Sequence, residues 1–432
     1  MEMHGWGRFP KLEAEVTYPL SPGQCASAIN DIENLIARGN GRSYGDSGLA
    51  SRLIDTRHLN HFLNFDETNG ILHCASGVLL RDIIKIFVPR GWFLPVTPGT
   101  AFVTVGGAIA SDVHGKNHHC DGTFTDYVTE IELLLGTGER VVTSLTDKPD
   151  LFHATCAGMG LTGIILSASI CLKPIKSSMM HETRIKAPDI DALLAAFSEH
   201  QGSTYSVAWI DCMAKGKNLG RSVLMLGEHA EDGHLNLANN TPLSIPFTIP
   251  QSLLNQTTVS LFNNFFYATK PQKLIRKVQF ESYFYPLDRV HNWNRLYGKA
   301  GFVQYQFVLP LTSGINGIRA ILERIAASGQ GSFLAVLKVF GKANNNHLSF
   351  PIEGYTLSLD FKVNQDMFLL LNDLDRLVLN HGGRLYLPKD ARMSETTFKK
   401  GYPRCNEFEE VRAKYGAIGK FASAQSKRLG LL

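Results

Sequence analysis

The sequence lacks the features that mark several classes of protein. No stretch reaches about 18 consecutive apolar residues, and Met1–Arg8 has neither the basic start nor the apolar run of a signal peptide. The seven cysteines are scattered and form no CxxC pair, which indicates reduced core residues in a cytosolic setting. The 43 basic and 39 acidic residues form no block of one sign, so nucleic acid is not expected as a partner.

What is present is a globular composition with enough length for two domains. The chain has 432 residues, of which 44% are hydrophobic and 19% are charged, and one domain takes roughly 100–200 residues. The first third alternates short apolar runs with glycine-rich turns, whereas longer strand-like and helical stretches begin near residue 176. We therefore expect a domain boundary at that point.

Local patterns predict several elements. We expect helices over 79–87, 149–156 and 367–381, a hairpin of strands 131–135 and 140–143, and a strand over 163–172. Residues 235–269 contain no Asp, Glu, Lys or Arg and are interrupted by proline. This segment is predicted to be a loop, either a buried connection or disordered excursion or a lid that touches an apolar ligand.

Two glycine-rich stretches suggest ligand contact through the backbone. Gly39–Asp46 has three glycines and a serine, so its N–H groups can approach a diphosphate closely. Thr97–Thr100 and Thr104–Gly115 are rich in small residues, which would let a flat ligand lie against the backbone. The alternatives are a plain turn for the first stretch and tight helix–sheet packing for the second.

Three histidines lie in the run His114–His119. A metal site is not expected, because no set of carboxylates accompanies them and Lys116 would repel a cation. We expect His114 and Lys116 to face an anionic or redox-active ligand, and His118 and His119 to make local hydrogen bonds.

Other residues in the chain bear on cofactor and substrate choice. Gly158–Gly163 fits GxGxxG, but a helix precedes it and a strand follows, so no NAD site is predicted. Gln304 and Gln306 alternate on a strand and share one face. Lys338 and Lys389 sit among apolar residues, either for function or as lysines that extend from a strand end to solvent.

Four segments together resemble the FAD-linked oxidases of the vanillyl-alcohol-oxidase type: Ala37–Asp46, Thr104–His119, Gly160–Ile165 and Gly382–Asp390. The likeness runs from about Gly5 to the C-terminus. It implies an α+β fold of two domains, with FAD held between them. Residues 1–175 would bind FAD, residues 176–383 would form an antiparallel-sheet substrate domain, and residues 384–432 would return to the FAD-binding domain.

The resemblance also implies roles for individual residues. The catalytic residues would be Lys389, His114 and Tyr44, and the substrate contacts Lys116, Gln304, Gln306, Lys338 and Ser358. The cofactor contacts would be Arg38, Gly39, Asn40, Gly41, Arg42, Ser43, Tyr44, Gly45, Gly99, Thr104, Val105, Gly106, Gly107, Ser111, Asp112, His114, Ile165, Tyr386 and Lys389. Many relatives link the flavin to a histidine in the first glycine-rich loop, where this chain has Arg42. We therefore expect non-covalent FAD.

In the reaction that the resemblance implies, Lys389 would oppose the charge that develops as hydride reaches the flavin. Lys116 or Lys338 would suit a phosphate, and the two glutamines would suit sugar hydroxyls. The base is left open, with His114 a candidate because its reference pKa is near neutral. Ser358 stands where one family member has cysteine, so activity without thiol-directed inhibition is expected.

The implied function is oxidation of the 2′-hydroxyl of a polyprenylphosphoryl pentose, as the first half of an epimerisation in cell-envelope arabinan synthesis. A short-chain-dehydrogenase-type reductase would complete it, and residues 235–269 would give the lipid tail an apolar surface. The alternatives are a soluble alditol or aldonolactone oxidase that uses dioxygen, and a flavin-free sugar or lipid carrier. The expected location is cytoplasmic, with peripheral contact at the inner membrane considered and the periplasmic side left open.

Overall fold

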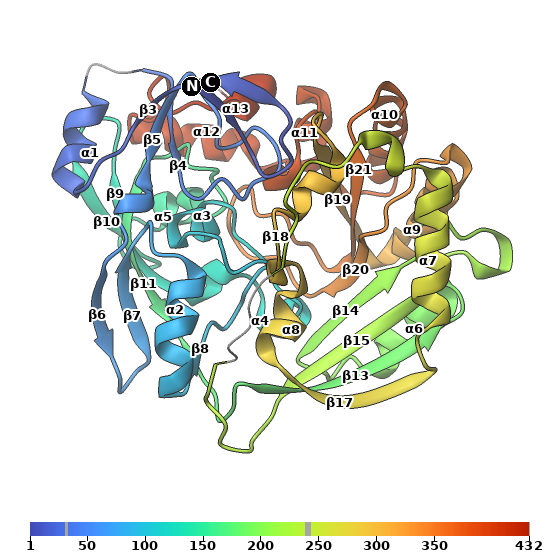
Figure 1. The fold of residues 1–432 in the computed structure, drawn as a ribbon. Helices are drawn as coiled ribbons and strands as arrows, with labels where there is room; N and C mark the ends of the chain where they lie inside the picture. The colour runs from blue at the N-terminus through green and yellow to red at the C-terminus, as the bar shows by residue number, and fades with distance from the viewer. Residues whose placement is uncertain (31–32, 238–242, 432) are drawn as a thin grey trace.

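The computed structural model describes residues 1–30, 33–237 and 243–431 (Figure 1). Near the N-terminus, β1 (Glu2–His4) and β2 (Lys11–Glu13) form a hairpin. A parallel sheet follows, in which β5 (Arg52–Asp55) lies between β3 (Glu15–Thr17) and β4 (Leu35–Arg38). Helix α1 (Pro22–Ile29) connects β3 to β4 and begins at Ser21, whose side chain accepts a hydrogen bond from Gln24 N.

A five-stranded antiparallel sheet forms the second layer of this half. Its order is β10 (Arg140–Thr143), β9 (Val128–Leu134), β11 (Ile164–Cys171), β7 (Ile71–Ala75) and β6 (Phe62–Asp66). Helices α2 (Leu80–Phe87), α3 (Val105–Ala110) and α5 (Pro149–Thr155) belong to the same half. Helix α2 buries Leu80, Ile83, Ile84 and Phe87, as its apolar spacing predicts.

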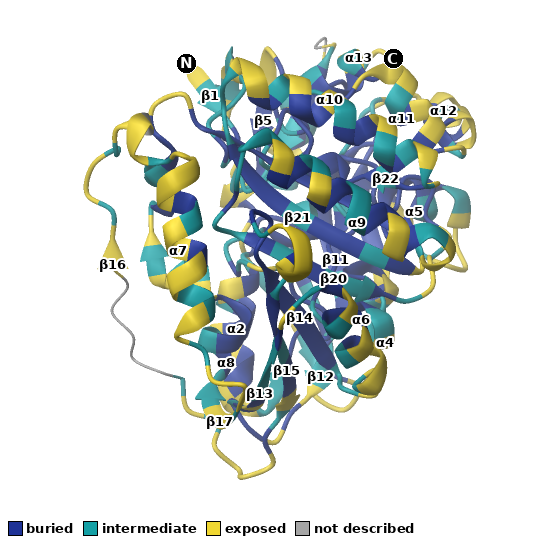
Figure 2. Cartoon of the chain, turned by 90° about the vertical axis from the view of Figure 1, so that its right-hand side faces the viewer, coloured by how far each residue is buried: buried dark blue, intermediate teal, exposed yellow. Residues whose placement is uncertain are grey.

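An eight-stranded antiparallel sheet dominates the second half of the molecule. The order is β17 (Lys273–Gln279), β13 (Met179–Ala187), β15 (Ser222–His229), β14 (Tyr205–Ile210), β20 (Ala335–Phe340), β21 (Gly354–Lys362), β19 (Phe302–Pro310) and β22 (Arg384–Leu385). Helices α6 (Ile190–Glu199), α9 (Leu311–Ser328) and α10 (Gln365–Asn380) cover one face and bury the largest hydrophobic core with it (Figure 2).

The other face of the large sheet is turned towards the first half and carries polar side chains. On β19 the side chains of Val303, Tyr305 and Phe307 enter the helix-covered core. Because side chains alternate along a strand, Gln304 and Gln306 point to the opposite face. The register of β19 with β21 places Ser358 beside Gln306 and Asp360 beside Gln304.

The last helices, α11 (Glu395–Gly401), α12 (Cys405–Lys414) and α13 (Ala424–Arg428), follow the large sheet. Phe421 pairs with Leu35 of β4, and Arg412 donates to the carbonyl of Leu161. These contacts support our proposal that the C-terminal segment returns to the first half, and the proposed division at 175 falls between β12 (Lys173–Pro174) and β13. One detail differs: β22, at the start of that segment, still pairs with β19.

The predicted helices, hairpin and strand are present, and the α+β class is confirmed. The prediction of a loop over residues 235–269 is wrong in part, because Gln256–Ala268 form the helix α7. Residues 238–242 of the predicted loop lie outside the described part of the chain. Asn255 caps α7, and Phe266 packs on Trp209 with ring centroids 4.5 Å apart. The cysteines are free, but Cys120 is exposed and not a core residue.

Candidate active site

The glycine-rich loop after β4 packs tightly between two other segments. A Cβ atom at Gly39 would lie 2.3 Å from Oγ1 of Thr104, at the start of α3. A Cβ atom at Gly45 would lie 1.7 Å from the carbonyl oxygen of Asp390, next to Lys389. Glycine is therefore required at both positions, and the loop brings α3 and the Lys389 segment together.

The charged side chains of this loop bind other parts of the protein. Arg38 donates to the carbonyl oxygens of Gly48 at 2.9 Å and His4 at 2.7 Å. The guanidinium of Arg42 lies over the ring of Trp6, 4.1 Å from its centroid. Burial lowers the pKa of both arginines from its ordinary value, but leaves them charged. The side chains thus fix the loop while its backbone faces a cavity.

That cavity is lined almost entirely by small residues and by backbone. Its lining residues are Gly5, Ala37, Arg38, Gly39, Gly41, Ser43, Gly45, Ser47, Gly48, Gly107, Ala110, Ser111 and Met159. At its edge Thr104 caps α3 by accepting from Gly107 N at 3.2 Å. A cradle that any larger side chain would fill, with charged arginine nearby, fits a cofactor that carries a diphosphate.

Several other predicted cofactor contacts are not among the residues that line this cavity. Asn40 donates to the carbonyl oxygen of Phe102 at 2.8 Å, and no atom lies within 4 Å of a Cβ built on Gly99. Val105 and Ile165 are buried in the core of the first half. Gly106 packs against Ser76, the residue after β7, because a Cβ atom at Gly106 would lie 3.0 Å from the Cβ atom of Ser76. For all these positions, contact with the cofactor stays a prediction.

The carboxylate of Asp112 is directed away from the cavity. It accepts from Ser349 Oγ at 2.6 Å, Asn344 Nδ2 at 2.8 Å and Thr125 Oγ1 at 2.5 Å. These bonds tie the segment after α3 to the loop 344–349 of the second half. Its side chain is therefore used within the protein, and only its backbone is available to a cofactor.

His114 is buried where the two halves meet. Its Nε2 lies 3.0 Å from Nε2 of Gln306, and its ring packs against Phe340, Phe350 and Tyr386. Burial, with Lys338 and other nearby cations, holds the pKa of His114 well below its usual value. His114 was a candidate base because the reference pKa of histidine is near neutral, and this reason does not hold for the buried side chain. Nδ1 is buried without a hydrogen-bond partner within the described residues, as expected of an atom that faces a ligand.

Three predicted site lysines come from different segments: Lys338 from β20, Lys389 from the segment after β22, and Lys116 from the segment after α3. Burial lowers the pKa of Lys389 to about 7 and that of Lys338 to about 8. The Nζ of Lys389 lies 3.8 Å from the ring centroid of Tyr44, over its face. Lys116 donates to the carbonyl of Tyr283, and burial lowers its pKa to about 7. Lysines with lowered pKa values in one region are typical of a functional site.

Asp360 was missed by the sequence prediction. It is 1% exposed and accepts from Nε2 of Gln304 at 2.6 Å. Burial raises its pKa to about 7, while the charge of Lys389 acts in the opposite direction. The signal was available, because Thr356, Ser358 and Asp360 alternate with the apolar Leu357 and Leu359 on β21. A carboxylate on the same face as the predicted Ser358 belongs to the same site.

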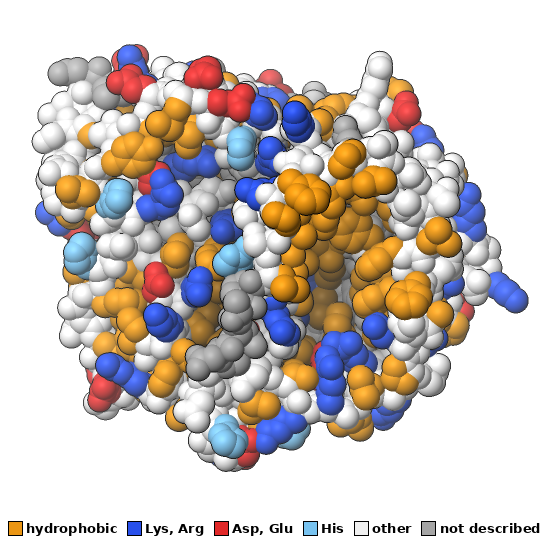
Figure 3. Space-filling view, viewed as in Figure 1, with side chains coloured by type: hydrophobic (Ala, Val, Ile, Leu, Met, Phe, Trp, Pro, Cys, Tyr) orange, Lys and Arg blue, Asp and Glu red, His pale blue; other side chains and the backbone are white. Residues whose placement is uncertain are grey.

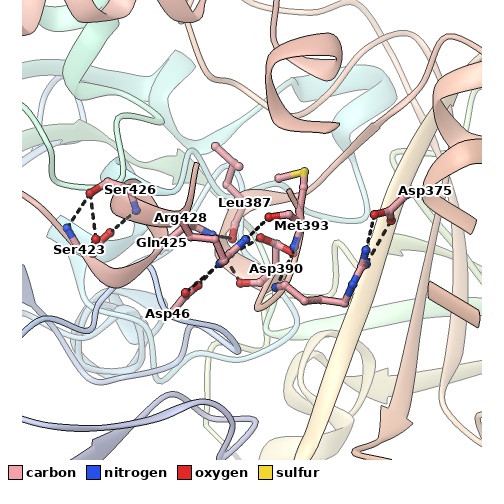
Figure 4. A network of polar contacts seen from close by, with 10 residues as sticks. Asp46, Asp375, Leu387, Asp390, Met393, Ser423, Gln425, Ser426 and Arg428 are labelled. Carbon is pink, nitrogen blue, oxygen red and sulfur yellow. Dashed lines mark hydrogen bonds and ion pairs between the residues drawn. The ribbon is translucent and has the colours of Figure 1, made fainter. Parts of the chain in front are cut away.

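The C-terminal helix α13 holds the Lys389 segment in place (Figure 4). Arg428 binds Asp46 of the glycine-rich loop at 2.7 Å and Asp390 at 2.9 Å, and it donates to the carbonyl of Met393. Gln425 donates to the carbonyl of Leu387 at 2.7 Å. One arginine therefore links the loop, the last helix and the residue next to Lys389.

The remaining histidines of the motif do not bond locally as predicted. His118 Nδ1 accepts from Gly341 N at 3.1 Å, and His119 Nε2 lies 2.8 Å from the carbonyl oxygen of Ser203. Both partners belong to distant parts of the second half. The pair thus joins the two halves, and within residues 1–30, 33–237 and 243–431 no cluster of metal-ligating side chains is found.

Comparison with known proteins defines the class. Residues 15–144 match the family model described as FAD binding domain, and the cavity fits that cofactor. The fold and the site define an FAD-dependent oxidoreductase of the vanillyl-alcohol-oxidase type.

Relatives narrow the class further. The chain is 38% identical to decaprenylphosphoryl-β-D-ribose oxidase of Mycolicibacterium smegmatis, over 99% of this chain and 97% of the relative. It is 31% identical to an uncharacterised protein of Streptomyces coelicolor over 82% of this chain, and 25% identical to L-gulonolactone oxidase 2 of Arabidopsis thaliana over 48%. The chain belongs to the family of decaprenylphosphoryl-β-D-ribose oxidase.

Proposed function

We propose that this enzyme oxidises the 2′-hydroxyl of a polyprenylphosphoryl pentose to the 2-keto sugar. The observation that carries the proposal is the polar patch on the open face of the large sheet. There Gln306 contacts His114 and lies between Gln304 on the same strand and Ser358 on β21, in a family whose mycobacterial member is named for decaprenylphosphoryl ribose. Amides and a hydroxyl suit the hydroxyls of a furanose, which a binding surface for a purely apolar ligand would not need.

FAD, when bound, supplies the acceptor for the hydride that leaves C2 of the sugar. The residues of the cradle that would hold its diphosphate are Gly39, Gly41 and Gly45, through their backbone, with Arg38 nearby. We propose that FAD is held without a covalent bond, because the place of the linking histidine is taken by Arg42, which stacks on Trp6. Acid precipitation should release all yellow colour into the supernatant; colour retained in the pellet would contradict this.

For the proton of the hydroxyl, Lys389 is the better candidate than His114. With a pKa near 7, the Nζ of Lys389 exists partly as the free amine at neutral pH and can take up that proton. The ammonium so formed lies near the carboxylate of Asp360, which stabilises it. His114, with its pKa pushed far down, would instead orient the substrate through Nδ1. Tyr44, below the Nζ of Lys389, positions this amine.

The lipid tail would lie in an apolar hollow of the second half. Figure 3 shows hydrophobic side chains lining a recess over the large sheet, beside α7. Large apolar side chains around α7 and its flanking segments are exposed: Leu243, Phe247, Leu253, Leu261, Phe262, Phe265 and Ile275. Such a set supports peripheral contact with a bilayer, from which a prenyl chain would enter. In the described ranges no helix is long and apolar enough to cross a membrane.

The membrane contact can be tested with vesicles. Phe265, which is 71% exposed, is replaced by serine, and Leu145, 58% exposed in the first half, is replaced in a control. Phe265→Ser should weaken sedimentation with phospholipid vesicles while Leu145→Ser leaves it unchanged. Equal behaviour of both variants would argue against the α7 surface. The side of the membrane stays a prediction, as does the reductase that must act on the 2-keto product to complete an epimerisation.

The function itself is tested by the visible absorbance of the flavin under anaerobic conditions. Polyprenylphosphoryl ribose or arabinose should bleach the oxidised flavin, whereas xylitol and a free aldonolactone should not. Bleaching by a free polyol or lactone, with none by the lipid-linked pentose, would transfer the assignment to the alditol or lactone oxidases. A protein that takes up no FAD would favour the carrier.

A further inference from the structure

Two arginines and a glutamate that the site described above does not use form a cluster on the open face of the large sheet. Glu182 on β13 lies directly opposite Arg276 on β17, and Arg184 follows two residues later on the same face. Glu182 is 2% exposed. It accepts from Nε of Arg184 at 2.9 Å and from Nε of Arg276 at 2.6 Å. The buried carboxylate therefore fixes both guanidinium groups.

The way in which the arginines are held leaves their binding ends open. Each one contacts Glu182 through Nε, and their Nη groups have no hydrogen-bond partner in the part of the chain that the structure describes. The side chains of Arg184 and Arg276 are 22% and 42% exposed, so a ligand can reach them. A guanidinium fork with free Nη groups is the group that proteins use to bind a phosphate in bidentate fashion.

The charge around the cluster is unbalanced. Lys116 lies close enough to feel the charges of Glu182, Arg184 and Lys338, and Arg184 and Arg276 both act on Lys270. The one carboxylate of the cluster thus faces several cations. An anion bound there would relieve the repulsion between them.

The cluster is also linked to the reacting groups through neighbouring strands of the sheet. Through the paired strands, Arg184 shares a row with Met225 on β15 and Val207 on β14, and Lys338 lies on β20, the strand next to β14. In Figure 3, Lys and Arg side chains lie along the lower rim of the apolar hollow, over β13 and β17. An anion on a lipid that enters the hollow over this rim would meet these cations.

We propose that Arg184 and Arg276, oriented by Glu182, form a capture site for the phosphate of a lipid-linked substrate. This inference rests on the proposed function, and it adds the step before the reaction. The cluster binds the phosphate at the rim, and Lys116 and Lys338 receive it deeper in the site. Since the capture step precedes the chemistry, the two arginines act on substrate association and not on hydride transfer.

The first test is binding of farnesyl phosphate to the FAD-loaded enzyme, measured by calorimetry. Replacing both arginines, R184Q with R276Q, should weaken binding at least about tenfold, which corresponds to the loss of one charge-assisted hydrogen bond. Binding of farnesol should not change. The matched control is K277Q, which removes a cation from β17 on the opposite face, where Lys277 pairs with Asp232. R184K with R276K, which keeps both charges, should lose less.

Each other outcome has a definite meaning. Unchanged farnesyl phosphate binding in a double variant that keeps its flavin spectrum and melting temperature would show a purely structural triad and overturn the proposal. So would a wild-type enzyme that does not bind farnesyl phosphate. If the double variant lost only sedimentation with phosphatidylglycerol vesicles, the arginines would contact membrane headgroups, which also overturns it. If farnesyl phosphate binding needed the arginines but no lipid-linked pentose bleached the flavin, the capture site would stand and the proposed function would fail.

Discussion

The cavity around the glycine-rich loop and the open face of the large sheet differ in the kind of residue that lines them. The loop cavity has almost no reactive side chain, and its glycines let backbone approach a cofactor. The sheet face, with the Lys389 segment beside it, concentrates titratable groups: burial shifts the pKa values of Lys338, Lys389 and Asp360. Changes in the first region should therefore act through cofactor retention, and changes in the second through rate and pH dependence.

The largest effect is expected at Gly45, in the loop. Gly45→Ala would place a Cβ atom 1.7 Å from the carbonyl oxygen of Asp390, so the loop must move away from the Lys389 segment. We expect a protein that purifies without flavin and melts at a lower temperature. Gly202→Ala, where no atom lies within 4 Å of the added carbon, should behave as wild type. Full flavin content in Gly45→Ala would show that the loop does not shape the cofactor site.

The second largest effect is expected at Lys389, among the titratable groups beside the sheet face. Lys389→Met should keep FAD but slow flavin reduction by about 10²–10³-fold, because both the proton acceptor and the positive charge are lost. Stopped-flow absorbance under anaerobic conditions measures the rate, and the flavin spectrum checks cofactor content. Loss of FAD with an unchanged rate per bound flavin would place Lys389 with the loop, not with the sheet face.

Asp360→Asn should move the pH dependence of the reaction. The carboxylate raises the pKa of Lys389, so without it the free amine persists to lower pH. The acid limb of the pH profile of flavin reduction should shift down by about one unit. An unmoved limb would exclude this coupling.

The same variant tests stability. The pKa of Asp360 in the folded state, about 7, lies above its unfolded value near 4, so wild type loses stability as the pH rises between these values. Asp360→Asn should lack that loss. Asp375→Asn is the matched control, because burial raises the pKa of Asp375 to about 7 as well, yet its partner Arg392 lies outside the site. It should change the stability profile without moving the acid limb.

The smallest effect on turnover is expected at Ser358. Ser358→Cys keeps a small side chain on the open face and should leave the rate nearly unchanged, while a thiol-directed electrophile should now inactivate the enzyme. The variant is made with Cys120→Ser, since Cys120 is exposed and would react first. Mass spectrometry identifies the labelled residue. Inhibition of the Cys120→Ser protein with Ser358 intact would mean that another group reacts.

The comparison also explains what the sequence could predict. The loop motif is contiguous, so its glycines and the resemblance they carry are visible in one stretch, as are amphipathic helices such as α2. The sheet face is assembled from strands far apart in the chain, and Asp360 could be linked to Lys389 only once the register was known. Helix α7 was missed because its large apolar side chains Leu261, Phe262 and Phe265 are exposed, and Val259 is its residue in the main core.

The sequence indicated which residues lie near the site, but it could not predict the surroundings of their side chains. His114 was predicted at the site, but its pKa is lowered first by burial and then by neighbours such as Lys338 on β20 and Lys389. In the same way, nothing in the string around Asp112 indicates that its carboxylate is taken up by Ser349 and Asn344. A residue's role as base or as structural anchor depends on such tertiary partners.

The most direct test of the central claim is an isotope effect on flavin reduction. Farnesylphosphoryl ribose is prepared with deuterium at C2 or at C3, and bleaching of the flavin is followed anaerobically. The account predicts that only deuterium at C2 slows bleaching, and that Lys389→Met slows both forms further. Bleaching that is slowed by deuterium at C3, or no bleaching with either substrate, would contradict it.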